Sequence, residues 1–418
     1  MKRINAVIFL LLFLWIIPNG CRVRNQILVT NLSGMYNPQS NPELSGLRVF
    51  HESDSVSRVY LGYQPSCLLY LLKPGSNYHT AEYKFSYNLL PDYESNTVID
   101  SGTFLLYDSL YYQNYLQLSY NFPIKAGLGQ NYLLDLKFTD LNSGEEQVYP
   151  VQVIKQNPEN AQHYLVVDEN DEIVFQDWIS WKTRFRIITS NLMAKQLHVK
   201  YYTDSFPAAR PPFSMEHPPV YQLKVTEEFT VSLENGSTPF LQYGREGFFQ
   251  FSADTTLKNG LTIFRFHDDY PQITEASLLP GPMRYLTTNE EFTKLIRQND
   301  IKSAVDHFWL STAGNENRSL ELFKHYFGRV EAANRYFPSY KEGWKTDRGM
   351  IYIIFGPPKE VFRRTNVETW VYGEPGKRVI LRFDFIRNNN PFTFNDWELV
   401  RLPEYKNPYY IAVDYWRR

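Results

Sequence analysis

Alternation of apolar and polar residues along residues 25–275 constrains the fold more than any other feature of this chain. In "AEYKFSYNLL", Tyr83, Phe85, Tyr87 and Leu89 fall on one side of an extended backbone. Two further segments repeat the pattern with Leu116, Leu118, Tyr120 and Phe122, and with Leu134, Leu136 and Phe138. Because neighbouring side chains of a strand point to opposite faces, this period predicts antiparallel strands with one buried and one wet face. Turn residues at intervals of roughly ten residues are typical of a β-sandwich.

A second strand-rich block follows from residue 156. Its strand candidates are "HYLVVD", "RFRIITS", "QLHVKYYTD", "YQLKVTEEFTVSL", "GFFQFSAD" and "LTIFRFHDD". The segment "SFPAARPPFSMEHPPV" interrupts them, and five prolines in sixteen residues exclude a central strand or a helix. We expect an irregular loop there, lying as a flap over the sandwich. The fold prediction is therefore two antiparallel β-sandwich (Ig-like) domains, at 21–155 and 156–278.

The pattern changes to helical near residue 286. Thr288 followed by Glu291 predicts a capping box at a helix start, and apolar residues then recur at helical spacing through three segments up to residue 337. The six-residue run "MIYIIF" reads as a strand buried on both faces, because it barely alternates. More alternation follows it. Residues 279–418 are thus predicted to form an α+β domain, helices first and a small sheet after.

The first twenty residues have the order of a secretion signal. Lys2 and Arg3 precede the apolar run "AVIFLLLFLWII", and "PNGC" ends at Cys21. This segment resembles a bacterial lipoprotein signal, which implies cleavage after residue 20 and lipidation of Cys21. An uncleaved membrane helix is the alternative. Cys67 lies in an apolar run and is expected to be a small buried residue, with a Cys21–Cys67 disulfide as the alternative.

Composition and motifs exclude several functional classes. A formal net charge of −2 gives no basic field for nucleic acid. The His and Cys residues show no metal-binding spacing, and the run His267, Asp268, Asp269 is better explained as the polar end of a strand. No phosphate-binding glycine motif and no nucleophile elbow occur, so no cofactor and no catalytic residue is predicted. A Ser/His/Asp triad stays open, because its members need not be close in sequence. The many aromatic residues, 16% of the chain, are expected to pack within sheets rather than to form a sugar-stacking surface.

The stretch "EGWKTDRGMIYIIFGPPKEV" carries the densest cluster of distinctive residues. Trp344 is expected to be a buried anchor, and Thr346 and Asp347 to accept hydrogen bonds from nearby backbone N–H groups. Gly349 is expected to permit an unusual backbone angle, and Arg348 to pair with a carboxylate such as Asp347 or with backbone carbonyls. The stretch thus indicates a joint between elements, although its charges also allow an active site.

This stretch resembles the signature of the GWxTD domain family, and the later "ETWVY" segment fits the same family order. The matching positions are Gly343, Trp344, Thr346, Asp347, Arg348, Gly349, Gly356, Pro357, Pro358, Trp370 and Tyr372. The resemblance covers roughly residues 280–400, with Met350 in place of a more usual Arg. It implies an envelope lipoprotein of Bacteroidetes-like bacteria with β-sandwich domains in front. It brings no activity with it.

The functional expectation is a lipid-anchored cell-envelope protein with a non-enzymatic binding or scaffold role. Its expected partners are the membrane, through the lipid on Cys21, and an envelope protein or glycan. Surface-exported lipoproteins of Bacteroidetes-like bacteria often carry an acidic run after the lipidated Cys. Basic "RVRNQ" follows Cys21 instead, so the resemblance implies an outer-membrane lipoprotein on the periplasmic face. The alternative is an envelope hydrolase with Asp347 and Arg348 in a cleft near the Gly356-Pro357-Pro358 turn.

Overall fold

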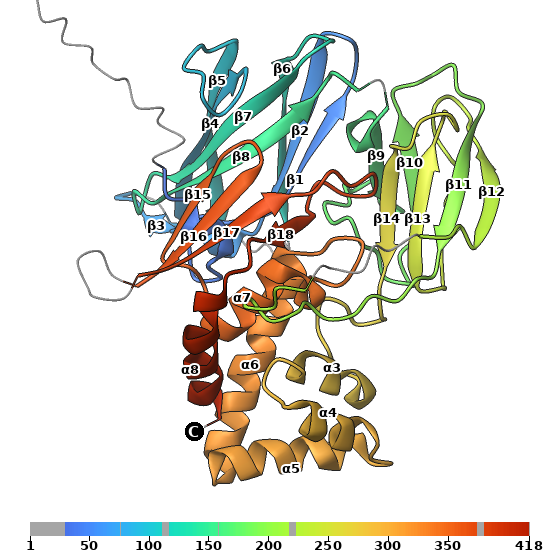
Figure 1. Cartoon of the computed structure of the whole chain (residues 1–418). Coiled ribbons are helices and arrows are strands. Elements are labelled where there is room, and N and C mark those ends of the chain that lie inside the picture. Colours follow the sequence, from blue (N-terminus) through green and yellow to red (C-terminus); the bar gives the residue numbers. More distant parts are fainter. Residues whose placement is uncertain are drawn as a thin grey trace, which may run out of the picture.

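The computed structural model describes residues 30–75, 77–110, 117–157, 159–216, 223–373 and 380–417. Antiparallel sheets make up the N-terminal part of this range, and a mixed α+β region follows (Figure 1). The predicted signal segment 1–20, Cys21 and Leu116 lie outside the described residues. No helix of the described part is long and apolar enough to cross a membrane.

Two sheets form the first strand-rich region. One has the order β1-β2-β6, and the other β3-β4-β7-β8 with β5 paired to β4. The strands are β1 (Leu44–His51), β2 (Val56–Tyr63), β3 (Leu71–Leu72), β4 (His79–Leu90), β5 (Asp100–Leu110), β6 (Leu118–Lys125), β7 (Asn131–Asp140) and β8 (Glu146–Ile154). Both sheets contribute to one core, in which Val59 of β2 and Phe122 of β6 join Phe85 of β4 and Leu136 of β7. The predicted alternation is confirmed here, since Tyr83, Phe85, Tyr87 and Leu89 are all buried. Cys67 is buried too, and it forms no disulfide with any described residue.

A second strand-rich region has its own core. It combines the pair β10-β9 with the four-stranded sheet β12-β11-β13-β14. The strands are β9 (Tyr164–Asp168), β10 (Phe185–Thr189), β11 (Gln196–Tyr202), β12 (Glu227–Ser232), β13 (Gly247–Ser252) and β14 (Leu261–Arg265). Their shared core includes Phe185, Val199 and Phe249. Each predicted strand segment contains one of these strands, although β12 takes up only the end of its segment.

Helices and a four-stranded sheet make up the C-terminal region. The sheet has the order β15-β16-β17-β18, with the strands β15 (Glu360–Arg363), β16 (Val367–Tyr372), β17 (Leu381–Arg387) and β18 (Trp397–Leu399). The helices are α3 (Pro280–Met283), α4 (Asn289–Ile296), α5 (Ile301–Ala313), α6 (Glu316–Tyr336), α7 (Asp347–Phe355) and α8 (Lys406–Trp416). Thr288 and Glu291 form the predicted capping box at the start of α4. In Figure 1 the sheet lies against the N-terminal strands, and the helices extend away from it.

The prediction of a strand at "MIYIIF" is wrong, because this run lies in α7. Asp347–Ile354 are all buried, so neither a period of two nor of 3.6 can show in the sequence, and a short apolar run fits both structures. The residues at the two ends of the run determine that it forms a helix. Thr346 caps the helix N-terminus, and Gly356 ends it with a positive φ of 85°.

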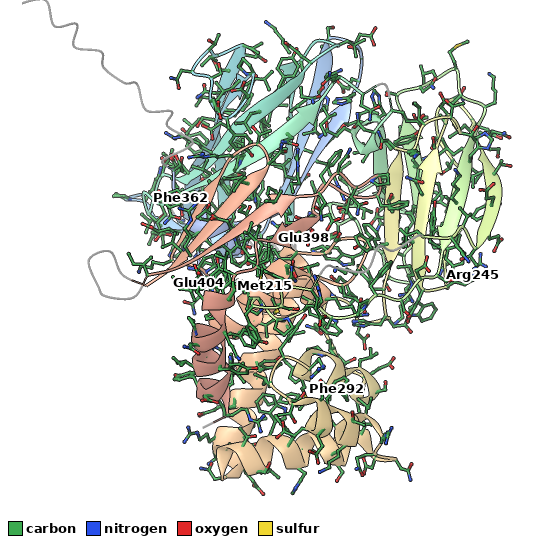
Figure 2. The ribbon with its side chains drawn as sticks, viewed as in Figure 1. Met215, Arg245, Phe292, Phe362, Glu398 and Glu404 are labelled. Carbon is green, nitrogen blue, oxygen red and sulfur yellow. The ribbon has the colours of Figure 1, made fainter. Side chains whose placement is uncertain are left out.

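The proline-rich segment is irregular, as predicted. Its described part, residues 205–216, is called the proline strap here. Phe206 at its start packs with Tyr202, Phe248 and Phe264 of the second strand-rich region, and Ala209 and Phe213 pack on the C-terminal region. The Ala209 N–H donates to the Tyr285 hydroxyl at 3.1 Å, and the Leu402 N–H donates to the Pro212 carbonyl at 3.2 Å. Phe213 contacts Tyr409 with ring centroids 5.8 Å apart. Figure 2 shows the strap at Met215, drawn over the C-terminal region. Because proline has no backbone N–H, this segment cannot pair as a sheet strand. It is held instead by its remaining backbone groups and by its side chains.

Candidate functional site

The motif Gly343-Trp344-Lys345-Thr346-Asp347 forms the corner between α6 and α7. Gly343–Lys345 make one turn of 3-10 helix, and Thr346 then serves as the N-cap of α7. The Thr346 hydroxyl accepts the Gly349 N–H at 3.0 Å and donates to the Gly343 carbonyl at 2.8 Å. One side chain therefore closes the turn and starts the buried helix.

Two positions of the corner, Gly343 and Gly349, must be glycine because a neighbouring backbone carbonyl lies too close for a side chain. A Cβ atom on Gly343 would overlap the Ala333 carbonyl of α6, and one on Gly349 would overlap the Gly343 carbonyl. Gly349 lies within α7 with ordinary helical geometry, so its expected role in an unusual backbone angle is wrong. The positive φ belongs to Gly356, at the other end of the helix.

Trp344 is a buried anchor between α3 and α6. Its backbone N–H donates to the Asn334 side-chain carbonyl at 3.0 Å, and its carbonyl accepts the Tyr285 hydroxyl at 2.8 Å. Asn334 is completely buried and also donates to the Pro271 carbonyl at 2.8 Å. Sequence reasoning missed Asn334, since nothing in its local sequence shows that its amide satisfies backbone groups of two other segments.

Asp347 is held by Arg401, which follows β18. The Arg401 guanidinium makes two bonds to the carboxylate, at 2.5 Å and 3.0 Å, and the Leu399 N–H donates to it at 2.8 Å. Both charged side chains are about 10% exposed. The expected pairing of Asp347 with Arg348 is wrong: neighbours at the start of a helix point in different directions, and each finds a partner far along the chain.

Arg348 belongs to a separate buried network centred on Glu368 of β16. Glu368 is 0% exposed and accepts bonds from Arg348 at 3.3 Å, from Arg363 at 2.7 Å and from the Trp370 indole at 2.8 Å. The Tyr36 hydroxyl also donates to it at 3.1 Å. Burial alone would raise the pKa of Glu368, but the two guanidinium groups and the indole hold it down to about 2.

This network ties the start of the described chain to the motif. Burial raises the pKa of Tyr36 to about 12, so its hydroxyl remains a donor at neutral pH. The Leu32 N–H donates to the Val361 carbonyl at 2.8 Å, and Leu32 and Tyr36 lie in the core of the C-terminal region. Residues far apart in sequence thus complete one hydrogen-bonded unit around α7.

The remaining motif positions close the other end of α7. The Tyr372 hydroxyl donates to the Gly356 carbonyl at 2.8 Å, which fixes the turn before β15. Pro357 is exposed and Pro358 is buried in that turn. Trp370 is fully buried on β16.

A cavity of about 670 Å³ lies beside the corner. Thr346, Asp347, Lys341 and Arg401 line it, together with Arg210 of the proline strap. Burial lowers the pKa of Lys341, although Asp347 and Asp396 act against this. A carboxylate and a lysine beside a cavity have the residue types of an acid/base site, yet both oxygens of Asp347 already accept protein donors.

No metal centre is formed by the described residues, where no group of three or more His, Cys, Asp or Glu side chains is placed to hold an ion. β14 ends at Arg265, and His267, Asp268 and Asp269 follow it as the predicted polar end of the strand. Asp268 pairs with Arg265, and Asp269 accepts a bond from Thr274. Cys21, the predicted lipidation site, lies outside the described range.

Comparison with known families identifies the C-terminal region. Residues 247–418 match the GWxTD domain. The matched segment starts at β13, so it takes in the last two strands of the second strand-rich region as well as the helices and the final sheet. No curated protein matches the chain.

Proposed function

We propose that this GWxTD-domain protein is a lipid-anchored cell-envelope protein with a non-enzymatic binding or scaffold role, in which the motif is the structural joint of its domain. The observation that carries the proposal is the engagement of the motif's polar groups. Asp347 accepts three hydrogen bonds, Arg348 is paired with Glu368, and Thr346 caps α7. Because these side chains are already hydrogen-bonded within the protein, they hold the GWxTD domain together as a rigid platform and are poorly placed to transfer protons to a substrate.

The platform joins the regions that precede it. Leu32 and Tyr36 enter its core, and the proline strap packs on the face next to α8. A binding surface on the strand-rich regions would therefore be held at a fixed position relative to the GWxTD domain. In this proposal the strand-rich regions are Ig-like sandwiches, supported by the core that the two N-terminal sheets share.

Strand β5 supports an envelope partner. Among the described residues it pairs only with β4, so its other edge offers unpaired backbone groups. Leu105 and Tyr107 on this strand are 52% and 64% exposed. An edge strand with exposed apolar side chains is suited to recognition by strand addition or to contact with a glycan.

The proposed location is the periplasmic face of the outer membrane, with the lipid on Cys21. Cross-linking in the native envelope followed by pull-down tests the binding role, and recovery of a defined envelope component is the expected result. Cys21→Ser tests the anchor by fractionation. The variant should leave the membrane fraction, whereas unchanged fractionation would contradict the lipid anchor.

A hydrolase remains the second candidate function, favoured by Asp347 and Lys341 lining the same cavity. Asp347→Asn separates the two. If the motif is a structural joint, Asp347→Asn should lower the thermal stability and leave the activity per folded molecule unchanged. A fully stable variant that loses an envelope hydrolase activity would replace the binding proposal with the catalytic one.

A further inference from the structure

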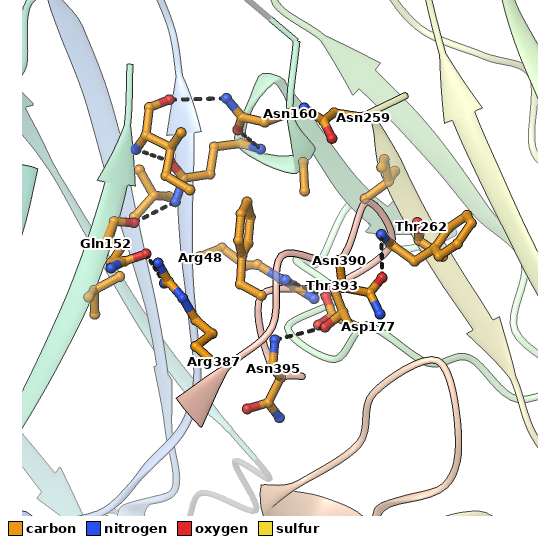
Figure 3. A pocket seen from close by; sticks show the side chains of 18 of the residues that line it. Arg48, Gln152, Asn160, Asp177, Asn259, Thr262, Arg387, Asn390, Thr393 and Asn395 are labelled. Carbon is orange, nitrogen blue, oxygen red and sulfur yellow. Dashed lines mark hydrogen bonds and ion pairs between the residues drawn. The ribbon is translucent and has the colours of Figure 1, made fainter. Parts of the chain in front are cut away.

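A second cavity lies where the three regions of the chain meet. It measures about 480 Å³ and shares the wall of residues 389–392 and Trp397 with the cavity beside Asp347. Its other walls come from β1 and β8 of the first region and from β9 and the start of β14 of the second (Figure 3). Ligand sites in proteins favour such junctions, and this volume falls within their usual range of roughly 300–1,000 Å³.

Arg387 brings a positive charge to this cavity, and no carboxylate of the described residues pairs with it. It donates to the side-chain carbonyls of Gln152 and, at 3.1 Å, of Asn366, both of which are neutral. No ion pair among the described residues includes Arg387, whereas Arg48 in the same cavity is paired with Asp177 at 2.7 Å. Burial lowers the pKa of Arg387, Tyr93 opposes this, and the neighbouring Arg363 adds to it. An anion placed here would supply the missing counter-charge.

Thr262 brings a hydroxyl to the same cavity. Its side chain is 4% exposed, it lines the cavity, and its Oγ1 has no hydrogen-bond partner within the described chain. A buried hydroxyl left unpaired is costly, so a polar group of a ligand that reaches Thr262 would be favoured here. Figure 3 shows Thr262 across the cavity from Arg387.

The remaining wall combines amide groups with flat apolar rings. Asn259 and Asn389 place amides at the cavity, and each amide both donates and accepts, as ring hydroxyls do. Trp397 is buried at the wall, and Phe394 at the same cavity is 47% exposed. Polar groups of this kind beside aromatic rings suit a compact, polyhydroxylated ring with one apolar face.

We propose that this cavity binds a carboxylate-bearing sugar of mono- to disaccharide size, with its carboxylate on Arg387 and ring hydroxyls on Thr262 and the amides. The inference rests on the proposed binding role and names its ligand class. The planar guanidinium fork matches a carboxylate in two parallel bonds, which a neutral sugar cannot offer.

Calorimetric titration of the detergent-solubilised full chain tests this. The probes are galacturonic acid and its dimer, with galactose and its dimer as the neutral counterparts. The acid forms should bind at least ~10-fold more tightly, because only they neutralise Arg387. Arg387→Gln should remove this preference, and Arg382→Gln should keep it. Arg382 lies on the same strand, but it is 62% exposed and paired with Asp384, away from the cavity.

Thr262→Val gives a second test that does not depend on the charge. Replacing a buried unpaired hydroxyl by a methyl group of the same shape should raise Tm while weakening acid-sugar binding. If Arg387→Gln fails to fold, Thr262→Val and the comparison of acid with neutral sugars still test whether the cavity binds an acid sugar. Equal binding of galactose, or no binding of either sugar, overturns the inference. If neither sugar binds but pull-down still recovers an envelope partner, the sugar site is refuted and the proposed binding role is not.

Discussion

Substitution of Glu368 by Gln should strongly destabilise the GWxTD domain. The change keeps the shape and the acceptor for Trp370, but it leaves Arg348 and Arg363 buried without a counter-charge. Breaking a buried ion pair from one side costs about 3–5 kcal/mol. The pKa gives a similar magnitude: a fall from 4.5 to about 2 corresponds to about 3 kcal/mol at 1.36 kcal/mol per unit.

Urea unfolding followed by tryptophan fluorescence is a suitable assay, because Trp370 touches Glu368 directly and reports on this region. The matched control is Glu290→Gln, since Glu290 is 78% exposed and pairs with Lys294 on the surface. The control should leave the free energy of unfolding nearly unchanged, because exposed ion pairs contribute little. If Glu368→Gln is as mild as its control, the reasoning about the buried network is refuted.

The same group predicts a pH dependence. The folded pKa of Glu368 lies below its unfolded value, so its contribution is complete above about pH 4.5 and is lost as pH falls toward 2. The stability difference between the natural protein and Glu368→Gln should therefore shrink over that interval, as measured by urea unfolding at each pH. A difference that stays constant from pH 6 to pH 2.5 would contradict this assignment.

Three further variants, two of them with a matched control variant, test the corner and the strap. Thr346→Ala should cost about 1 kcal/mol of unfolding free energy through loss of the α7 N-cap, with Thr346→Ser close to the natural protein in the same urea assay. Gly349→Ala should destabilise by about 1–3 kcal/mol through backbone overlap, while Gly328→Ala in α6, where a Cβ meets open space, should stabilise by up to ~1 kcal/mol. Phe213→Ala should speed proteolytic cleavage within the strap by removing its contact with α8, and unchanged cleavage would count against that packing.

Local patterns in the sequence predicted the local structure well. The buried face of β4 follows from strict alternation, because one face of this strand meets a core. The prediction of one wet face is wrong for β7, since residues on both of its faces are buried. The capping box at Thr288 follows from two residue types at fixed spacing. The GWxTD resemblance located the domain that the family comparison then identified.

Long-range partners could not be predicted in the same way. Arg401 is the partner of Asp347 across 54 residues, and Tyr36 meets Glu368 across 332 residues. Nothing in the local sequence selects these partners over other residues of the same charge. The wrong prediction of a strand at "MIYIIF" has a related cause. Surrounding elements bury α7 on all sides, and this removes the apolar periodicity that would mark a helix in the sequence.

A double-mutant cycle on Asp347 and Arg401 tests the central claim, that the motif is a structural joint, most directly. Asp347→Asn, Arg401→Gln and the double variant are compared by urea unfolding, with recovery of the proposed envelope partner by cross-linking measured per folded molecule. The account predicts a coupling free energy of about 2 kcal/mol and unchanged partner recovery. A coupling near zero, or full stability with loss of function in Asp347→Asn, would contradict it.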